Sequence, residues 1–240
     1  LDDAAFPANY TWQPGNYYGY FNGYVTVRDA IAQSMNLPAA RANMKVDVDF
    51  AFNFAKNCGL KSLVSRKDNS AKNDESAASL ALGGLTDGVT PLEMANAYST
   101  IANGGLYIEP KLYTKVVNQK GEEILIATSD AKRVMKDSTS YMLTSCLQSV
   151  VKPGGTAYGY VGAGNMAVAG KTGNTNDDKD QWFCGYTPYY TIACWNGYDN
   201  NDKPIGYRKI GSYPYTSVYL FNQVMNKICE GKPSAGFAAK

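Results

Sequence analysis

The chain has 240 residues, of which 45% are hydrophobic, so it can bury the core of one large domain. Its net charge is only +2, and its basic residues neither cluster nor alternate with aromatic residues, so we expect no nucleic acid partner. It contains no histidine, which excludes Ser-His-Asp and Cys-His catalysis and every histidine-based metal site.

Neither a membrane span nor a secretory signal is visible in the sequence. No apolar run approaches the ~20 residues that cross a bilayer, and the first residues lack the pattern of a signal peptide. We therefore expect any anchor or targeting segment to lie outside this sequence.

The five cysteines form no Cys-x-x-Cys pair, so neither a zinc site nor a redox motif is expected, and no cofactor is predicted. Most of them fit the role of small core residues. Cys184 and Cys194 fall in two strands that are expected to pair, which leaves a cross-strand disulfide between them open.

The first half of the chain is predicted to be irregular over 1–25 and then mainly helical. The helices are expected from Thr26, over 47–58 with Phe50, Phe54 and Ala55 inward, over 76–82, and from Thr90. The last begins with the strongest signal, an N-cap followed by proline and, three residues after the cap, glutamate.

Two polar residues, Ser34 and Asn36, follow the first predicted helix. Pro38 disfavours helical geometry at Leu37, so both are expected near a helix end. There they either project into a cleft or simply cap and turn the chain.

The second half is predicted to form a hairpin over 113–117 and 123–127, a helix over 138–151, and three consecutive strands. The second and third strands are expected over 181–186 and 191–198, and a final amphipathic helix over 216–230. The residues expected inward on the two helices are Met142, Cys146, Leu147 and Val150, then Val218, Phe221, Val224, Met225 and Ile228. This order predicts an α+β fold in which helices cover an antiparallel sheet.

The first strand of the three ends in Lys171-Thr172-Gly173, where a polar run begins. A strand edge offers backbone N–H and C=O groups to an extended peptide, and the lysine adds a positive potential for a carboxylate. The triplet alone is weak evidence of a site, because such short strings also arise by chance.

Several stretches together resemble the transpeptidase domain of penicillin-binding proteins, most closely the class A, bifunctional kind. These stretches include Gly23-Tyr24-Val25-Thr26-Val27-Arg28, Ser34-Met35-Asn36-Leu37-Pro38-Ala39, Gly83-Gly84-Leu85-Thr86-Asp87-Gly88-Val89-Thr90-Pro91-Leu92-Glu93-Met94-Ala95, and Ala169-Gly170-Lys171-Thr172-Gly173-Asn174-Thr175-Asn176-Asp177. The match runs from about residue 13 to the final helix.

The resemblance implies three motifs, Ser-x-x-Lys, Ser-x-Asn and Lys-Thr-Gly. The second is present at Ser34 and Asn36 and the third at Lys171, whereas the first is missing before Ser34. Two later Ser-x-x-Lys strings, which begin at Ser129 and Ser149, are interpreted as coincidence. Residues 1–240 are therefore expected to be the C-terminal portion of a single transpeptidase domain, incomplete at its N-terminal side, with the nucleophile on a segment that this sequence does not include.

The resemblance also implies the site residues and their roles. Ser34, Asn36 and Lys171 would be catalytic, with Lys171 attracting a carboxylate, Ser34 relaying a proton and Asn36 binding the substrate backbone. The substrate-binding residues would be Thr172, Gly173, Asn174 and Thr175. Asn174 departs from the threonine that family members usually carry, but its backbone N–H would still serve the oxyanion hole.

The implied function is peptidoglycan D,D-transpeptidation, a serine acyl transfer that cross-links stem peptides. Its partners would be these peptides, β-lactams and the missing part of its own domain, at the extracytoplasmic face of the membrane. This chain alone is expected to be inactive, because it lacks the serine. The alternatives are a non-catalytic module that binds wall peptides, and a D,D-carboxypeptidase or β-lactamase that transfers the acyl group to water.

Overall fold

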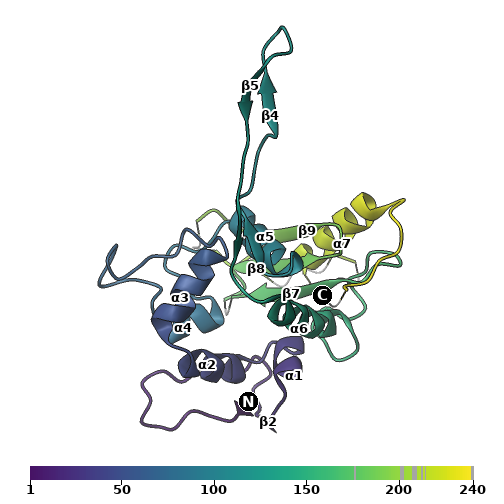
Figure 1. Cartoon of the computed structure of the whole chain (residues 1–240). Helices are drawn as coiled ribbons and strands as arrows, with labels where there is room; N and C mark the ends of the chain where they lie inside the picture. Colours follow the sequence, from purple (N-terminus) through teal and green to yellow (C-terminus); the bar gives the residue numbers. More distant parts are fainter. Residues whose placement is uncertain (176, 201–202, 207–209, 212, 214, 239–240) are drawn as a thin grey trace.

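A three-stranded antiparallel sheet lies at the centre of the structure, with helices packed on both faces (Figure 1). The structure is a computed structural model that describes residues 1–175, 177–200, 203–206, 210–211, 213 and 215–238. The sheet consists of β7 (Ala169–Asn174), β8 (Asp180–Tyr186) and β9 (Thr191–Gly197), in that order. The predicted meander and the predicted α+β class are confirmed.

The two faces of the sheet are covered by different helices. On one face, α7 (Thr216–Cys229) places Phe221 against Phe183 of β8, with ring centroids 4.6 Å apart. On the other face, α5 (Pro91–Ala102) and α6 (Asp137–Gln148) pack over Ala169 and Tyr186. Gly170, the second residue of β7, is required there because a Cβ would lie 2.8 Å from the Phe183 ring. These contacts fix the strand that carries the Lys-Thr-Gly triplet.

The first predicted helix is followed directly by a second helix that was not predicted, which corrects the expectation for Pro38. Helix α1 (Val27–Ala32) ends before Ser34, and α2 (Asn36–Lys45) begins at Asn36. Leu37 is therefore helical although a proline follows it. Pro38 is tolerated because it lies in the first turn of α2, where a backbone N–H has no partner within the helix.

Helix α3 (Val48–Asn57) begins at Asp47, whose side chain accepts a hydrogen bond from the N–H of Phe50. The predicted inward face is partly wrong. Phe52 is the buried residue, whereas the Phe50 side chain is 63% exposed and stacks on Phe54. The later helix α4 (Ala77–Leu82) confirms the helix predicted over 76–82. It lies beside α2.

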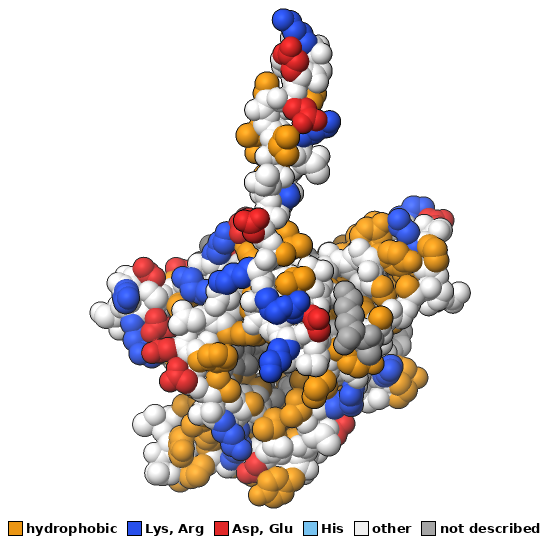
Figure 2. Space-filling model, in the orientation of Figure 1, with side chains coloured by type: hydrophobic (Ala, Val, Ile, Leu, Met, Phe, Trp, Pro, Cys, Tyr) orange, Lys and Arg blue, Asp and Glu red, His pale blue; other side chains and the backbone are white. Residues whose placement is uncertain are grey.

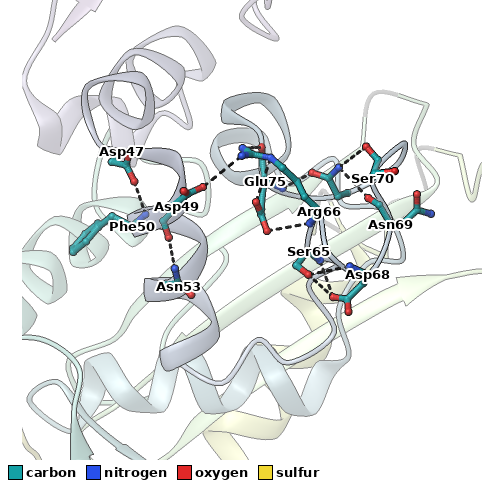
Figure 3. A network of polar contacts seen from close by, with 11 residues as sticks. Asp47, Asp49, Phe50, Asn53, Ser65, Arg66, Asp68, Asn69, Ser70 and Glu75 are labelled. Carbon is teal, nitrogen blue, oxygen red and sulfur yellow. Dashed lines mark hydrogen bonds and ion pairs between the residues drawn. The ribbon is translucent and has the colours of Figure 1, made fainter.

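The loop between α3 and α4 is held by a polar network (Figure 3). Arg66 forms ion pairs with Asp49 of α3 and with Glu75. Next to this network, the fully buried Asp74 accepts hydrogen bonds from the backbone N–H groups of Val64 and Thr86. The loop is thus tied to α3 on one side and to the segment that precedes α5 on the other.

Short strands complete the fold. β1 (Asp2–Asp3) pairs with β2 (Gly23–Tyr24), and β3 (Leu106–Ile108) pairs with β6 (Ala131–Arg133). The predicted hairpin forms from β4 (Lys115–Val117) and β5 (Glu123–Ile126) and projects from the body as an arm, on which hydrophobic and charged side chains are exposed (Figures 1 and 2). A 3-10 turn, η1 (Ser149–Val151), follows α6.

The strand register answers the question of the Cys184 and Cys194 pair. Phe183, not Cys184, lies opposite Cys194, so the two cysteines point to opposite faces of the sheet. Both thiols are free, and burial raises the pKa of Cys194 to about 11. A disulfide between them is therefore ruled out by geometry.

Three residues predicted to face inward are exposed instead, namely Met142, Val224 and Ile228. On α6, the buried positions are Ser140, Thr144 and Leu147, because the hydroxyl of Ser140 donates to Ile101 O and that of Thr144 bonds to Tyr186. Polar side chains thus occupy two of the three buried positions of α6, which periodicity alone does not reveal. Among the described residues, no helix has the length and apolar character to cross a membrane.

Candidate active site

The structure brings together Lys171 and Ser34, which lie far apart in the sequence. The ammonium of Lys171 donates a hydrogen bond to Ser34 Oγ over 2.7 Å, although 137 residues separate them in the chain. The same ammonium donates to the backbone carbonyl of Thr172 at 3.0 Å. The Ser-x-Asn turn and the Lys-Thr-Gly strand therefore meet within hydrogen-bond reach, as expected from the sequence.

Ser34 occupies a strained position that ends α1. Its N–H donates to Ile31 O, and the N–H of Met35 donates to Ala30 O, which is the hydrogen-bond pattern of a Schellman motif. In this motif the residue after the cap is left-handed and usually glycine, and Ser34 has a φ of 58°. This backbone conformation turns the exposed Ser34 hydroxyl toward Lys171.

Lys171 is half-buried and has no carboxylate partner among the described residues. Desolvation disfavours its charged form and lowers the pKa of Lys171 to about 8. The side chain is therefore poised near neutral pH between an ammonium that attracts anions and an amine that accepts a proton.

Asn36 is held by the loop that precedes β2. Its side-chain Nδ2 donates to Gly15 O at 2.7 Å, and its backbone N–H donates to Asn16 Oδ1 at 3.0 Å. The Oδ1 of Asn36 has no hydrogen-bond partner within the described part of the chain. Asn36 thus keeps an acceptor that a peptide N–H can use.

The free edge of β7 presents backbone groups beside Lys171. Thr175 N donates to Asp180 O, so by alternation the N–H and C=O groups of Lys171 and Gly173 point toward β8. Those of Thr172 and Asn174 point away from β8, to the edge that has no neighbouring strand among the described residues. An extended peptide can add to this edge, and the Asn174 N–H is available to a developing oxyanion.

Thr172 is supported by a residue that the sequence did not single out, Thr156. The two hydroxyls share a hydrogen bond of 2.8 Å, and the backbone N–H of Thr156 donates to Ala32 O at the end of α1. The preceding Gly155 lets the chain pass close to η1, since a Cβ there would lie 2.3 Å from two backbone oxygens of that turn. Thr156 therefore joins the Lys-Thr-Gly strand to the helix that precedes Ser34.

The side chains of Asn174 and Thr175 turn away from this cluster. Asn174 Nδ2 donates to Asp178 Oδ1 at 2.6 Å, and Thr175 Oγ1 accepts hydrogen bonds from the N–H groups of Lys179 and Asp180. Their predicted contacts to a substrate carboxylate stay predictions. Asn176, the next residue of the matching stretch, lies outside the described residues.

The two Ser-x-x-Lys strings do not form a second lysine–serine pair. Ser149 Oγ accepts a hydrogen bond from Arg28 of α1 at 3.0 Å, and Ser129 lies at the root of the β4–β5 arm. Neither serine has a hydrogen bond to a lysine side chain within the part that the structure describes. The geometry is in line with the interpretation of both strings as coincidence.

Three supporting residues escaped the sequence analysis. Arg28 bonds to Ser145 and Ser149 and so ties α1 to α6 and η1, while Asn16 and Thr156 hold the two motifs. The sequence offered only weak signals for them. Asn16 and Arg28 lie within the match to the family, which begins at about residue 13, and Thr156 ends a Gly-Gly-Thr string after the predicted helix over 138–151. None of these signals specifies a long-range partner.

Comparison with known families decides the identity of the domain. The sequence matches the model of the penicillin binding protein transpeptidase domain over residues 2–216. The chain belongs to this family. Its relatives include penicillin-binding protein 1A of Clostridium botulinum, 36% identical over 216 residues that make up 90% of this chain, and penicillin-binding protein 1F of Bacillus subtilis, 36% identical over 91% of this chain.

This penicillin-binding protein domain spans only part of those relatives, namely 24% of the Clostridium protein and 29% of the Bacillus protein. Among solved structures, PonA1 of Mycobacterium tuberculosis in complex with penicillin V is similar, with a TM-score of 0.82 and 22% identity over 99% of this chain and 65% of the other. Penicillin-binding protein 1A of Haemophilus influenzae gives a TM-score of 0.79 and 23% identity over 99% of this chain and 40% of the other. The shared fold confirms the predicted class.

Proposed function

We propose that this domain is part of a peptidoglycan D,D-transpeptidase, whose nucleophilic serine lies on a segment that this sequence does not include. The observation that carries the proposal is the 2.7 Å hydrogen bond from Lys171 to Ser34 at the open edge of β7, in a member of this family. On this view residues 1–240 are the C-terminal portion of a single transpeptidase domain.

In the first half-reaction, the serine oxygen attacks the amide carbonyl of a terminal D-Ala-D-Ala unit. An ester forms, the amide C–N bond breaks, and D-alanine leaves as an amine that gains a proton. The Lys171 ammonium attracts the terminal carboxylate, and it keeps Ser34 Oγ supplied with a proton that Ser34 can give to the leaving amine. In the second half-reaction, an amine of a neighbouring stem peptide takes the acyl group and releases the serine.

The β7 edge supplies substrate binding in this scheme. The peptide lies antiparallel along the outward N–H and C=O groups of Thr172 and Asn174, and the Oδ1 of Asn36 accepts from its backbone. The Thr172 hydroxyl, held by Thr156, binds the carboxylate, and Gly173 lets β7 lie close to Trp182 of β8, since a Cβ there would lie 3.2 Å from the Trp182 side chain. The Asn174 N–H is one oxyanion donor, worth ~2.7–4 kcal/mol of transition-state stabilisation.

The partners follow from this chemistry. They are stem peptides, β-lactams that mimic the D-Ala-D-Ala unit, and the remainder of the transpeptidase domain. Such a substrate lies outside the cytoplasmic membrane, so we place the domain at its extracytoplasmic face, anchored by a segment outside this chain. Water in place of the acceptor amine would give a carboxypeptidase or a β-lactamase instead.

One observation favours a second candidate, a non-catalytic module that binds wall peptides. The described residues hold the peptide-binding edge but no serine that meets a Ser-x-x-Lys lysine at the cleft. Such a module would bind the same peptides through β7 without forming an ester.

Intact-protein mass spectrometry after incubation with a fluorescent penicillin separates the two candidates. The whole protein, from which this chain derives, should gain the mass of one penicillin on a serine outside residues 1–240, and prior unfolding should abolish the adduct. A folded whole protein without an adduct would leave only the binding module. An adduct on Ser129 or Ser149 would overturn the assignment of the nucleophile.

A further inference from the structure

A buried carboxylate lies behind the Ser-x-Asn turn and is linked to it by one side chain. Asp3 is fully buried, and its Oδ1 accepts a 2.6 Å hydrogen bond from Nδ2 of Asn16. The Oδ1 of Asn16 in turn accepts from the backbone N–H of Asn36 at 3.0 Å. A continuous path of hydrogen bonds therefore runs from Asp3 to Asn36 of the Ser-x-Asn motif.

The path has a fixed direction, because each group can play only one role. The carboxylate of Asp3 accepts only, so Asn16 must turn its NH2 group toward Asp3. The amide oxygen of Asn16 then faces Asn36, where a donor needs an acceptor. If the amide of Asn16 were reversed, an NH2 group would meet the N–H of Asn36, and the hydrogen bonds to Asp3, to Asn36 and to the carbonyl of Tyr20 would all be lost.

The N–H of Asn36 depends on this acceptor. Asn36 is the first residue of α2, where N–H groups have no partner inside the helix, and the preceding Met35 offers no side-chain cap. Asn16 supplies the missing cap from 20 residues away. The carbonyl of Gly15 takes the side-chain NH2 of Asn36 at 2.7 Å, so two neighbouring residues of one loop hold both donors.

Asp3 is itself held by further donors. Its Oδ2 accepts from the backbone N–H of Asn22 at 3.0 Å and from Asn22 Nδ2 at 2.9 Å. Burial raises the pKa of the Asp3 carboxyl, but the hydrogen bonds from Asn16, Asn22 and Tyr18 together lower it more, so it stays ionised at neutral pH. The path of hydrogen bonds from Asn36 through Asn16 therefore ends in a charged carboxylate that is held by donors on both oxygens.

We propose that Asp3 and Asn16 are positioning residues of the transpeptidase site, and that Asp3 orients the amide of Asn16 so that it fixes Asn36 and the turn that carries Ser34. The proposal rests on the proposed function. Ser34 is two residues before Asn36 and holds a left-handed conformation, so a displaced Asn36 would move its hydroxyl from Lys171.

Exchanging the carboxylate and the amide between positions 3 and 16 conserves the net charge and tests the direction of these hydrogen bonds. In Asp3→Asn, the new amide keeps its oxygen toward the donors of Asn22 and turns NH2 toward Asn16, which forces Asn16 to reverse. In Asn16→Asp, two carboxylates face each other at the position of the 2.6 Å bond. In the double variant, the amide at position 3 donates to the carboxylate at position 16, whose second oxygen accepts from Asn36.

The readout is the second-order rate of penicillin acylation of the whole protein, together with its thermal unfolding. Each single variant should acylate at least tenfold more slowly at a temperature where it is folded, and the double variant should recover to within about threefold of wild type. The loss should lie in the acylation step more than in reversible binding. Asp74→Asn is the matched control, because it changes another fully buried carboxylate that holds two backbone N–H groups away from the site.

The control should lower the unfolding temperature without slowing acylation of the folded fraction. The positioning role of Asp3 and Asn16 is refuted if both single variants acylate like wild type, or if the double variant is no faster than the slower single variant. If a single variant does not fold, Asn16→Ala provides the test, because it leaves Asp3 with the donors of Asn22 and should still slow acylation at least tenfold. A folded wild-type protein that penicillin does not acylate would instead refute the proposed function.

Discussion

The ammonium of Lys171 lies 2.7 Å from the hydroxyl of Ser34, and the same lysine has its pKa lowered to about 8 by desolvation. The contact joins the end of α1 to the middle of β7, so neither residue forms the site without the other element. Because the lysine donates this hydrogen bond, its protonated form both attracts a carboxylate and keeps the proton on Ser34.

The pH dependence of acylation should report the titration of Lys171. Protonated Lys171 is needed in the free protein, so the second-order rate of acylation should fall as pH rises through about 8. Lys171→Arg should acylate more slowly but lose this falling limb, because a guanidinium stays charged. The measurement is a stopped-flow pH profile from 6.5 to 10, and Lys152→Arg, at an exposed lysine, should leave the wild-type profile unchanged. A wild-type rate that does not change over this range would contradict the role of the ammonium.

The same titration should appear in the stability of the protein. The folded state holds Lys171 with a pKa of about 8, below the ordinary value of 10.5, so the unfolded state binds more protons between these pH values. The free energy of unfolding contributed by Lys171 should therefore rise with pH over this window. Lys171→Met should stabilise the protein at pH 7 by about 1–2 kcal/mol. It removes the cost of desolvating the ammonium, which outweighs the loss of the hydrogen bonds that the ammonium donates.

Urea unfolding at pH 7 and pH 10 measures this effect. The difference in unfolding free energy between Lys171→Met and wild type should shrink at pH 10, where wild-type Lys171 is already neutral. A variant that is less stable than wild type at both pH values would show that the hydrogen bonds of Lys171 outweigh its desolvation.

Ser34 should show a conflict between backbone strain and function. A non-glycine residue in the left-handed region costs roughly 1–3 kcal/mol, whereas glycine avoids this cost but gains entropy when unfolded. Ser34→Gly should therefore be more stable than Ser34→Ala by about 1 kcal/mol. Both variants lose the hydrogen bond to Lys171, so their difference reports the backbone strain minus the entropy that glycine gains when unfolded.

Both variants should acylate roughly 10²–10⁴-fold more slowly than wild type, because the proton relay is gone. Urea unfolding and acylation rates measured on the same preparations separate the two effects. A glycine variant that is less stable than the alanine variant by about 0.5–1 kcal/mol, the entropic cost of glycine alone, would argue that Ser34 carries no strain. An acylation rate equal to that of wild type in the alanine variant would show that the Ser34 hydroxyl does not transfer the proton.

Local signals predicted much of this fold. The capping box of Thr90 and Glu93 forms as expected, with hydrogen bonds in both directions. The meander and the final helix also follow from local periodicity, which strands and helices express within a few residues. The separate helix α2 was missed because Pro38 was interpreted as a break and not as a residue of a first turn.

The candidate site was predictable only in part, for a physical reason. Ser34 and Lys171 belong to motifs that are visible in the sequence, although their contact spans 137 residues. Asn16 and Thr156 act through single long-range hydrogen bonds, and an isolated asparagine or threonine carries no signal of its partner. The choice of Phe52 over Phe50 as the inward residue of α3 likewise depends on neighbours outside the helix.

The loop before α4 offers a contrast between a buried and an exposed carboxylate. Asp74 is fully buried and accepts from the N–H groups of Val64 and Thr86, so Asp74→Ala would leave two donors without a partner. This change should destabilise the protein by roughly 3 kcal/mol. Among the described residues the Asp68 carboxylate, in the exposed network of Figure 3, bonds only to Ser65, and Asp68→Ala should cost within about 0.5 kcal/mol.

Urea unfolding of the two variants at pH 7 checks the contrast. Since Asp74 ties the loop to Thr86, ahead of α5, its loss should also increase amide hydrogen exchange over 64–86 while exchange in β7 and β8 stays slow. Similar costs for the two variants would mean that water replaces the carboxylate of Asp74 after local opening. In that case the loop, and not the carboxylate, would set the stability of this end of the fold.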